Sequence, residues 1–173
     1  MIFPEFYYKT RYAYMDFYTS NNNWYISSPD QTDFIFTIKH IINNIWSVNG
    51  IKYDRYGDIT KILEIFDLID NQWIKILNKN TIKSDDTIEY IPSEEFPLYY
   101  HNTYYNYMFL SGNINGKWSL CPPNQMDWQI EISELFEDIW LVKSCRELEE
   151  IIRIYEKKDE DWNKIFEFSD NIS

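Results

Sequence analysis

Short runs of aromatic and β-branched residues alternate along the whole chain with clusters of Asn, Asp, Ser, Gly and Pro. This pattern is typical of short strands joined by tight turns, because ring-bearing and branched side chains favour a pleated surface and the small polar residues favour turns. The segment 59–79 also fits a helix, but the turn residues at 70–72 favour a hairpin. We therefore predict strands over 6–18, 24–27, 61–69, 73–77, 87–91, 104–112, 116–121, 128–132 and 139–143.

Two segments have apolar residues at helical spacing. In the first, Ser28 and Gln31 form a capping pair ahead of a stripe that ends at Asn49 and Gly50. That stripe consists of Phe34, Ile38, Ile41, Ile42 and Ile45. The sequence thus predicts one early helix between residues 28 and 49.

The second helical pattern lies at the C-terminal end. Ser144 and Glu147 have the spacing of a capping box, and the apolar stripe that follows continues beyond a charged break. Its members are Leu148, Ile151, Ile152, Tyr155, Trp162, Ile165 and Phe166. The fold class that we predict is α+β: a mainly antiparallel sheet of short strands with one early helix and a C-terminal helical segment. Because no Gly/Ser linker or internal repeat marks a boundary, we expect a single globular domain over residues 1–173.

Charge restricts the partners of this chain. Its 28 acidic and 16 basic residues give a net charge of −12, and residues 127–173 hold 14 of the acids against 6 bases. Such a chain repels phosphates, so we expect no direct nucleic-acid partner and no membrane partner. A basic protein is the expected partner. With neither a signal peptide nor a long apolar run, and with only Cys121 and Cys145, we predict a cytoplasmic protein with reduced, buried thiols.

The common catalytic motifs are missing from the sequence. Four scattered glycines supply no phosphate-binding loop, and the His and Cys residues are too far apart in sequence for a zinc site. His101 could meet Cys121 across a hairpin, but this pairing is weak evidence for a nucleophile. The acid pairs Asp85/Asp86, Glu94/Glu95 and Asp159/Asp161 are expected by chance among so many acids. We therefore predict no catalytic residue, no metal and no cofactor.

The segment "LYYHNTYYNYMFL", residues 98–110, contains five tyrosines and one histidine. Three interpretations are open: a buried aromatic core, a pocket that stacks a ring-shaped ligand, or a surface that binds another protein. Tyr suits the third because it gives contact area at low entropy cost and keeps its hydroxyl hydrated. The candidate partner-binding residues combine these rings with nearby acids and with the acidic tail: Glu94, Glu95, Tyr99, Tyr100, Tyr104, Tyr105, Tyr107, Asp159, Glu160, Asp161 and Trp162.

These features favour a non-enzymatic acidic binding protein. We expect an inhibitor or immunity-type protein that neutralises a basic partner, such as a nuclease toxin, by occupying its cationic cleft with carboxylates and aromatic anchors. A phage or plasmid counter-defence protein that mimics nucleic-acid charge, to block a nucleic-acid-binding enzyme, would have the same composition. A small enzyme with an aromatic-lined pocket is the alternative from another class.

Overall fold

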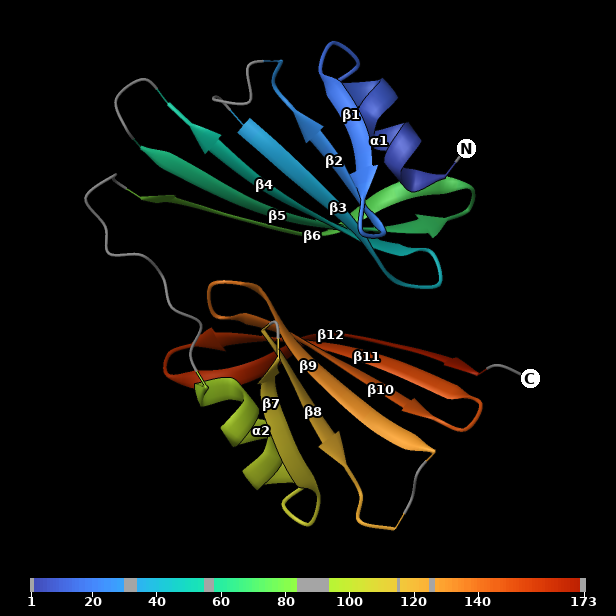
Figure 1. Cartoon of the computed structure of the whole chain (residues 1–173), viewed down its shortest axis with the longest axis vertical. Coiled ribbons are helices and arrows are strands. Elements are labelled where there is room, and N and C mark those ends of the chain that lie inside the picture. The colour runs from blue at the N-terminus through green and yellow to red at the C-terminus, as the bar shows by residue number, and fades with distance from the viewer. Residues whose placement is uncertain are drawn as a thin grey trace. The chain divides into compact units, whose positions relative to one another are not determined.

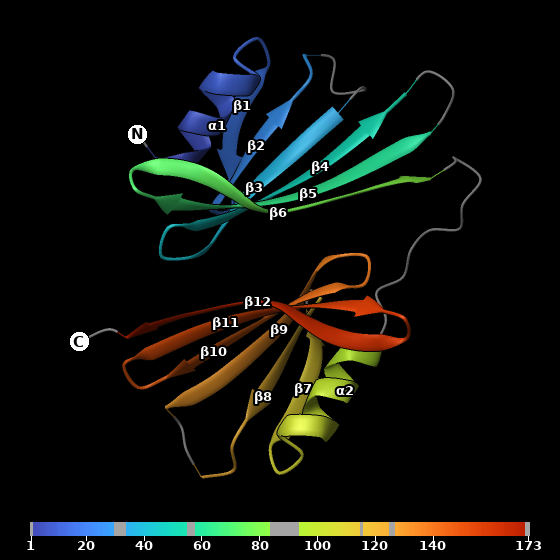
Figure 2. The same cartoon turned by 180° about the vertical axis from the view of Figure 1, so that it is seen from behind.

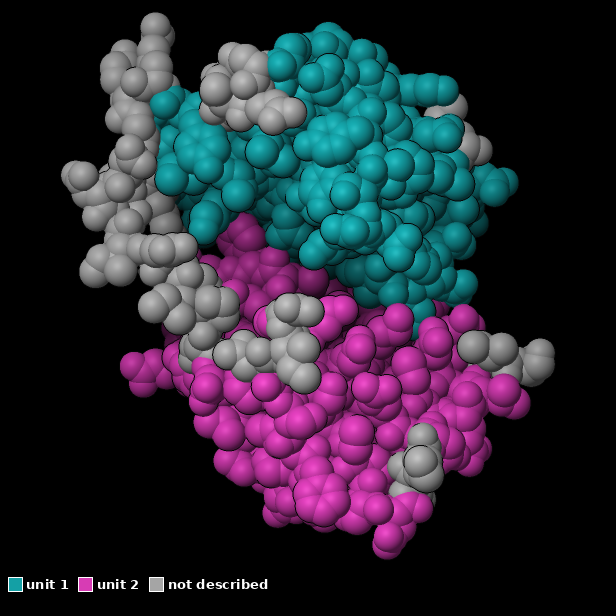
Figure 3. Space-filling view, in the orientation of Figure 1, with its two compact units in different colours: residues 1–89 teal, residues 90–173 magenta. Residues whose placement is uncertain are grey.

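A computed structural model describes residues 2–29, 34–54, 58–83, 94–114, 116–124 and 127–171. The chain divides into two compact units, residues 1–89 and 90–173, coloured separately in Figure 3. Both consist mainly of antiparallel strands (Figure 1). The prediction of a single globular domain over residues 1–173 stays a prediction, and the structure adds that such a domain would contain two compact units.

Unit 1 is a short helix followed by a six-stranded meander. Helix α1 covers Phe3–Arg11 and has Pro4 in its first turn, where a missing N–H costs nothing. The strands pair only with their neighbours in sequence, in the order β1-β2-β3-β4-β5-β6. Their bounds are β1 Asp16–Ser20, β2 Asn23–Ser27, β3 Phe34–Ile42, β4 Ile45–Tyr53, β5 Ile59–Ile69 and β6 Gln72–Lys83.

Unit 2 has the same order of elements. Helix α2 covers Glu95–Tyr104, and the sheet order is β12-β11-β10-β9-β8-β7. The strands are β7 Phe109–Ile114, β8 Lys117–Cys121, β9 Trp128–Phe136, β10 Ile139–Arg146, β11 Glu149–Lys158 and β12 Asp161–Asn171. In the reverse view of Figure 2, each helix again lies against its own sheet.

The two units also share residues at equivalent places. Phe3-Pro4 lies in the first turn of α1 as Phe96-Pro97 lies in the first turn of α2, and Tyr7, Tyr12, Tyr14 and Met15 correspond to Tyr100, Tyr105, Tyr107 and Met108. Further along, Trp46, Trp73 and Lys75 correspond to Trp140, Trp162 and Lys164. The β5/β6 and β11/β12 pairs also carry register shifts at matching points. The chain therefore contains an internal repeat of one fold, which was not predicted from the sequence.

Each unit has its own aromatic core on the helix-facing side of its sheet. In unit 1 the buried residues are Phe3, Tyr7, Met15, Ile26, Phe36, Ile38, Val48 and Phe66. In unit 2 they are Phe96, Tyr100, Met108, Leu120, Ile130, Ile132, Trp140, Val142 and Tyr155. The helix aromatics lie close to the sheet aromatics, for example with 4.9 Å between the ring centroids of Phe3 and Phe66. This packing explains why Phe and Tyr recur at helical spacing in α1 and α2.

Both predicted helices are wrong. The stripe from Phe34 to Ile45 lies in β3 and β4, which pair antiparallel. The C-terminal segment forms β10, β11 and β12. Ser144 caps no helix, because its hydroxyl oxygen accepts a hydrogen bond from the Trp128 indole at 3.1 Å. Leu148, a member of the predicted apolar stripe, is 64% exposed. β-branched residues that satisfy helical spacing also satisfy a strand, and here pairing between strands decides.

The first predicted strand is wrong for the opposite reason. Residues 6–11 lie in α1, and only 16–18 of the predicted stretch belong to a strand. Likewise, the first part of the tyrosine run lies in α2, which ends at Tyr104, and Tyr105 and Tyr107 precede β7 at Phe109. The prediction was wrong because Tyr and Phe have a high strand propensity. In the structure several of these rings lie in helices, where they pack on an aromatic sheet.

The hairpin predictions are largely confirmed. Strands β5 and β6 pair around Asp70-Asn71, and β7 pairs with β8. The strands predicted over 24–27, 128–132 and 139–143 are also present. The strand predicted over 87–91 lies outside the described residues. Over the residues that the structure describes, the protein is thus a mostly-β fold with two short helices, which agrees with the predicted class only broadly.

Candidate functional site

Several of the predicted binding residues line one pocket of unit 2, which we call the acidic pocket. It has a volume of about 480 Å³ and lies where the first turn of α2 meets the β11–β12 turn. Its lining residues are Glu95, Tyr99, Glu160, Asp161, Trp162 and Asn163. The tight turn between β11 and β12 places carboxylates directly beside the aromatic first turn of α2. Five of the six lining residues are among the predicted ones, and Asn163 is the addition.

The aromatic wall of the acidic pocket is held by the core. The Trp162 ring packs on the buried Phe96 ring, with 4.9 Å between centroids, and Phe96 in turn packs on Trp140 and Tyr155. The Tyr99 ring lies beside the Phe96 ring, with 6.1 Å between their centroids. Burial raises the pKa of Tyr99, and so does its hydrogen bond with Tyr104. Packing against the core therefore fixes the positions of both rings.

A lysine of the chain itself lies beside these groups. The Lys157 ammonium donates a hydrogen bond to Glu95 Oε1 at 2.7 Å and lies 5.9 Å from the centre of the Trp162 ring. The hydrogen bond to Glu95 raises the pKa of Lys157. One carboxylate and one ring thus stabilise an ammonium group together, which is the combination that favours cations at protein surfaces. The sequence analysis missed Lys157, and only the fold reveals it.

Backbone strain marks the same turn. Asp159 and Glu160 have φ angles of 54° and 66°, which is the left-handed geometry of a tight hairpin turn. Asn and Gly adopt this geometry readily, whereas Glu does so at a cost of about 1 kcal/mol. Unit 1 has Asn71 at the position equivalent to Glu160, with φ 62°. Unit 2 therefore carries a carboxylate where stability alone would favour Asn.

The pocket chemistry is specific to unit 2. Trp73 keeps the place of Trp162, but the positions equivalent to Glu95, Tyr99, Glu160 and Asp161 hold Ile2, Phe6, Asn71 and Gln72. Unit 2 has 16 acidic and 7 basic residues, whereas unit 1 has 12 and 9. The shared tryptophan serves the common fold, and the acids are an addition to one copy.

The other predicted tyrosines do not line the acidic pocket. Tyr100 is 1% exposed, and its hydroxyl oxygen accepts a hydrogen bond from Arg153 at 3.3 Å. Burial raises its pKa. Tyr105 is half-buried against Tyr100 and Trp128, while Tyr104 and Tyr107 are exposed. The five tyrosines therefore divide into core and surface residues. Glu94 and Asp159 are exposed near the pocket but outside its lining.

The structure also locates the remaining titratable candidates. His101 lies on α2, and its Nε2–H donates to the Met108 carbonyl at 2.9 Å, so this nitrogen is not available as a base. Both cysteines are free, but Cys121 is exposed, which contradicts the predicted burial. Burial raises the pKa of the half-buried Cys145. Asp85 and Asp86 lie outside the described residues. Among the residues that are described, no group of three or more His, Cys, Asp and Glu side chains could hold a metal ion.

Sequence reasoning missed one buried ion cluster in unit 1. Glu64 is 7% exposed and accepts a hydrogen bond from the Tyr7 hydroxyl at 2.7 Å. Lys75 and Arg11 approach the other carboxylate oxygen at 2.7 Å and 3.7 Å. In the equivalent place unit 2 has Arg153, which pairs with Glu167 at 3.2 Å. No sequence signal distinguishes Glu64 from other strand acids.

Comparison with known proteins gives no relative: no family model matches, and neither does any curated protein or solved structure. In the part of the chain that the structure describes, neither helix has the length and apolar character needed to cross a membrane.

Proposed function

We propose that this chain is a non-enzymatic binding protein that captures a basic partner protein through the acidic pocket of unit 2. The observation that carries the proposal is the combination of three carboxylates, Glu95, Glu160 and Asp161, with the rings of Tyr99 and Trp162 around one cavity. Rings and carboxylates together suit a Lys or Arg side chain, whose aliphatic stem packs on the rings while its charged end meets the acids. The occupant is thus one cationic side chain of the partner.

Lys157 supports this proposal because it already forms the same kind of contact. Its ammonium pairs with Glu95 and lies over Trp162, so both groups are oriented to stabilise a positive charge. Glu160 and Asp161, on the turn, supply further carboxylates for an incoming cation. The strained backbone at Glu160 fits a functional position, since strain is retained where a side chain is needed for a purpose other than stability.

The class of partner follows from charge. Unit 2 repels nucleic acid, and its acids would steer a basic protein toward the pocket and accelerate association. A protein that binds nucleic acid offers the densest display of Lys and Arg, and blocking that surface would inhibit it. We therefore propose an inhibitor or immunity-type protein of the cytoplasm, whose target is a basic protein such as a nuclease toxin.

Affinity capture tests the proposal. The full chain and its variant Glu160→Asn/Asp161→Asn are immobilised, and proteins retained from a lysate are compared by quantitative mass spectrometry. The variant loses two charges at the pocket and keeps a side chain that the turn accepts. We expect basic proteins to be retained by the wild type and lost with the variant, and the purified partner to bind the variant at least about 10-fold more weakly.

The matched control is Asp16→Asn/Asp70→Asn, which removes two charges from exposed positions of unit 1. It should retain the partner as the wild type does. Equal loss of the partner with both variants would show that net charge alone is responsible. Retention of the same proteins by the pocket variant would refute a role for the acidic pocket.

A further inference from the structure

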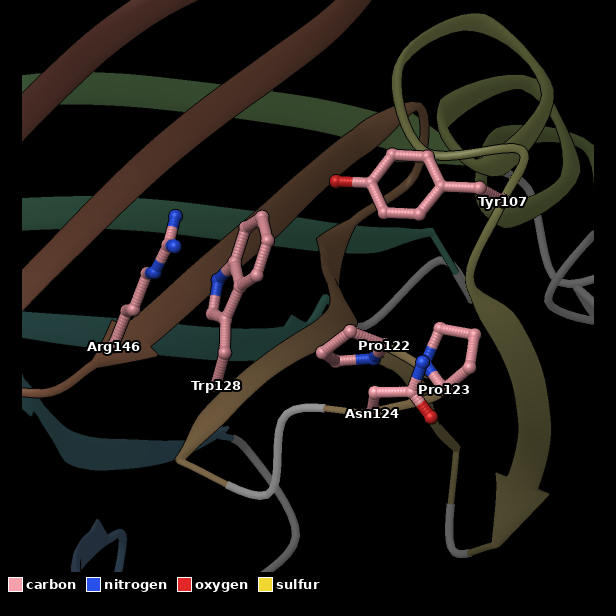
Figure 4. Close-up of a pocket in the computed structure, with 6 residues that line it drawn as sticks. All are labelled: Tyr107, Pro122, Pro123, Asn124, Trp128 and Arg146. Atoms are coloured by element: carbon pink, nitrogen blue, oxygen red, sulfur yellow. The ribbon is translucent and has the colours of Figure 1, made fainter.

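A second pocket of unit 2, which we call the aromatic–proline pocket, has a different lining from the acidic one. It has a volume of about 340 Å³ and lies beside the loop between β8 and β9. Its lining residues are Tyr107, Pro122, Pro123, Asn124, Trp128 and Arg146. Figure 4 shows Arg146 on one side of the Trp128 ring and Tyr107 with the two prolines on the other. Its walls are therefore mostly rigid rings.

Contacts with the rest of unit 2 fix these rings. The Trp128 indole N–H donates to the Ser144 hydroxyl at 3.1 Å, and Tyr105 meets the Trp128 ring edge-on at 5.7 Å. The Arg146 guanidinium lies 4.5 Å from the centre of the Trp128 ring. Because the indole N–H already has a partner, the ring offers a ligand its apolar surface and not a hydrogen bond.

Unit 1 has residues of similar chemistry at the equivalent positions. Tyr14, Pro29, Phe34 and Lys52 correspond to Tyr107, Pro123, Trp128 and Arg146. The Lys52 ammonium lies 5.6 Å from the centre of the Phe34 ring, as Arg146 lies over Trp128. Tyr14 is 73% exposed and Tyr107 is 57% exposed. Packing of a core explains why Tyr7 and Tyr100 are shared, but it does not explain a tyrosine kept at an exposed position in both copies.

We propose that the aromatic–proline pocket binds an extended, proline-containing peptide segment with an acidic residue beside its prolines. A polyproline II segment is preformed and presents flat pyrrolidine rings, which dock between aromatic side chains at low entropic cost. Its carbonyl groups have no internal hydrogen bonds and would accept them from the Asn124 amide and the Tyr107 hydroxyl. The volume is at the lower end for ligand sites, which suits a few residues of a peptide.

The acidic residue of the ligand follows from Arg146. Its guanidinium stacks on Trp128 and forms no ion pair with any residue that the structure describes, although unit 2 contains 16 acids. A cation that stacks on a ring still presents its N–H donors at the edge of the guanidinium plane, where a carboxylate can accept two hydrogen bonds. This site therefore favours a negatively charged ligand, whereas the acidic pocket favours a positively charged one. The proposal for this site does not depend on the function proposed for the acidic pocket.

Nuclear magnetic resonance of the full chain tests this site directly. The indole N–H signal of Trp128 is assigned with Trp128→Phe, a change that unit 1 accommodates at Phe34. Polyproline peptides ending in glutamate or in lysine are titrated, with a glycine–serine peptide of equal length as the control. We expect a saturable shift of the Trp128 signal with polyproline, stronger for the glutamate peptide, and none with glycine–serine.

Variants connect that shift to the pocket. Tyr107→Ala should weaken polyproline binding about 10-fold and leave the melting temperature unchanged, because the ring is exposed. Tyr104→Ala, which removes an exposed ring outside the pocket, should leave binding unchanged. Arg146→Glu should reverse the preference between the two polyproline peptides. The proposal is overturned if polyproline leaves the Trp128 signal in place, if Tyr107→Ala binds like the wild type, or if the glycine–serine peptide produces the same shift.

Discussion

Equivalent residues of the two units carry opposite charges at one position beside the helix tyrosine. Glu64 of unit 1 and Arg153 of unit 2 both contact the helix tyrosine, but the hydrogen bond is reversed: Tyr7 donates to Glu64, whereas Tyr100 accepts from Arg153. A hydroxyl can do either, so the same tyrosine serves both charges. Burial alone would lower the pKa of Arg153, but Tyr100, Tyr105 and Glu167 outweigh this effect and the net pKa is raised. The guanidinium therefore stays charged. The shared fold therefore requires a partner for the tyrosine and not one particular charge.

Removing the buried carboxylate tests this conclusion. Glu64→Ala removes the carboxylate that accepts the hydrogen bond of the Tyr7 hydroxyl and leaves Lys75 without its closest acid. We expect a loss of about 2–3 kcal/mol in the free energy of unfolding, since the buried hydroxyl loses this hydrogen bond while Lys75 remains partly solvated. Urea unfolding measures the loss. Asp16→Ala, at an exposed strand residue, should change stability by less than about 0.5 kcal/mol.

Buried tyrosines also make stability depend on alkaline pH. Burial raises the pKa of Tyr155 to about 12 and raises those of Tyr7 and Tyr100 further. Above pH 10 the unfolded chain releases these protons while the folded chain still holds them, so stability falls as pH rises. Each such group contributes a slope of about 1.4 kcal/mol per pH unit between the unfolded and folded pKa values. Tyr155→Phe should therefore flatten the decline between pH 10 and about 12.

Urea unfolding at several pH values measures that slope. Tyr14→Phe, which alters a ring that is 73% exposed, serves as the control and should leave the slope as in the wild type. An unchanged slope in Tyr155→Phe would mean that the Tyr155 proton is not linked to folding.

At the scale of elements, the hairpin turns determine the local geometry. Three two-residue turns have both central residues at positive φ: Asn21-Asn22, Asp70-Asn71 and Asp159-Glu160. Asn is suited to the second position and Glu is not. Glu160→Asn should therefore raise the free energy of unfolding by about 0.5–1 kcal/mol and at the same time weaken capture of the basic partner. Thermal unfolding and partner titration on one sample measure both effects. A variant that is stabilised and binds as tightly as the wild type would separate Glu160 from function.

Features that depend on local sequence could be predicted, whereas features that depend on packing or strand pairing could not. The hairpin around residues 70–71 was predicted because its turn chemistry is local. Five of the six residues that line the acidic pocket were among the predicted binding residues, because acids and aromatics lie close together in sequence. The helices were missed because α1 and α2 are short and aromatic, and their helical state depends on packing against Phe66 and Trp140. Lys157 and Arg146 could not be predicted from the sequence either, because pairing between strands is what brings them to the two pockets.

At the scale of the whole molecule, a duplicated fold carries unequal charge. Unit 1 has 12 acids and 9 bases, whereas unit 2 has 16 acids and 7 bases, so most of the net charge of −12 belongs to the copy with the acidic pocket. Both copies keep the aromatic residues that pack helix on sheet. The excess of acids is therefore not a requirement of the fold, and solubility alone would not concentrate it in one unit.

This asymmetry predicts how association should respond to salt. Surface charges act mainly on the association rate and are screened over about 8 Å at physiological ionic strength, so the rate for the basic partner should fall clearly from low to high salt. Glu160→Asn/Asp161→Asn should lower the low-salt rate and reduce its salt dependence, because it removes carboxylates at the proposed binding site. Asp16→Asn/Asp70→Asn removes the same net charge from unit 1 and should change the association rate and its salt dependence much less. Stopped-flow or surface-based kinetics at several salt concentrations measure both. Equal effects of the two variants would mean that the partner responds to net charge, and a rate independent of salt would mean that the acids of unit 2 serve only solubility.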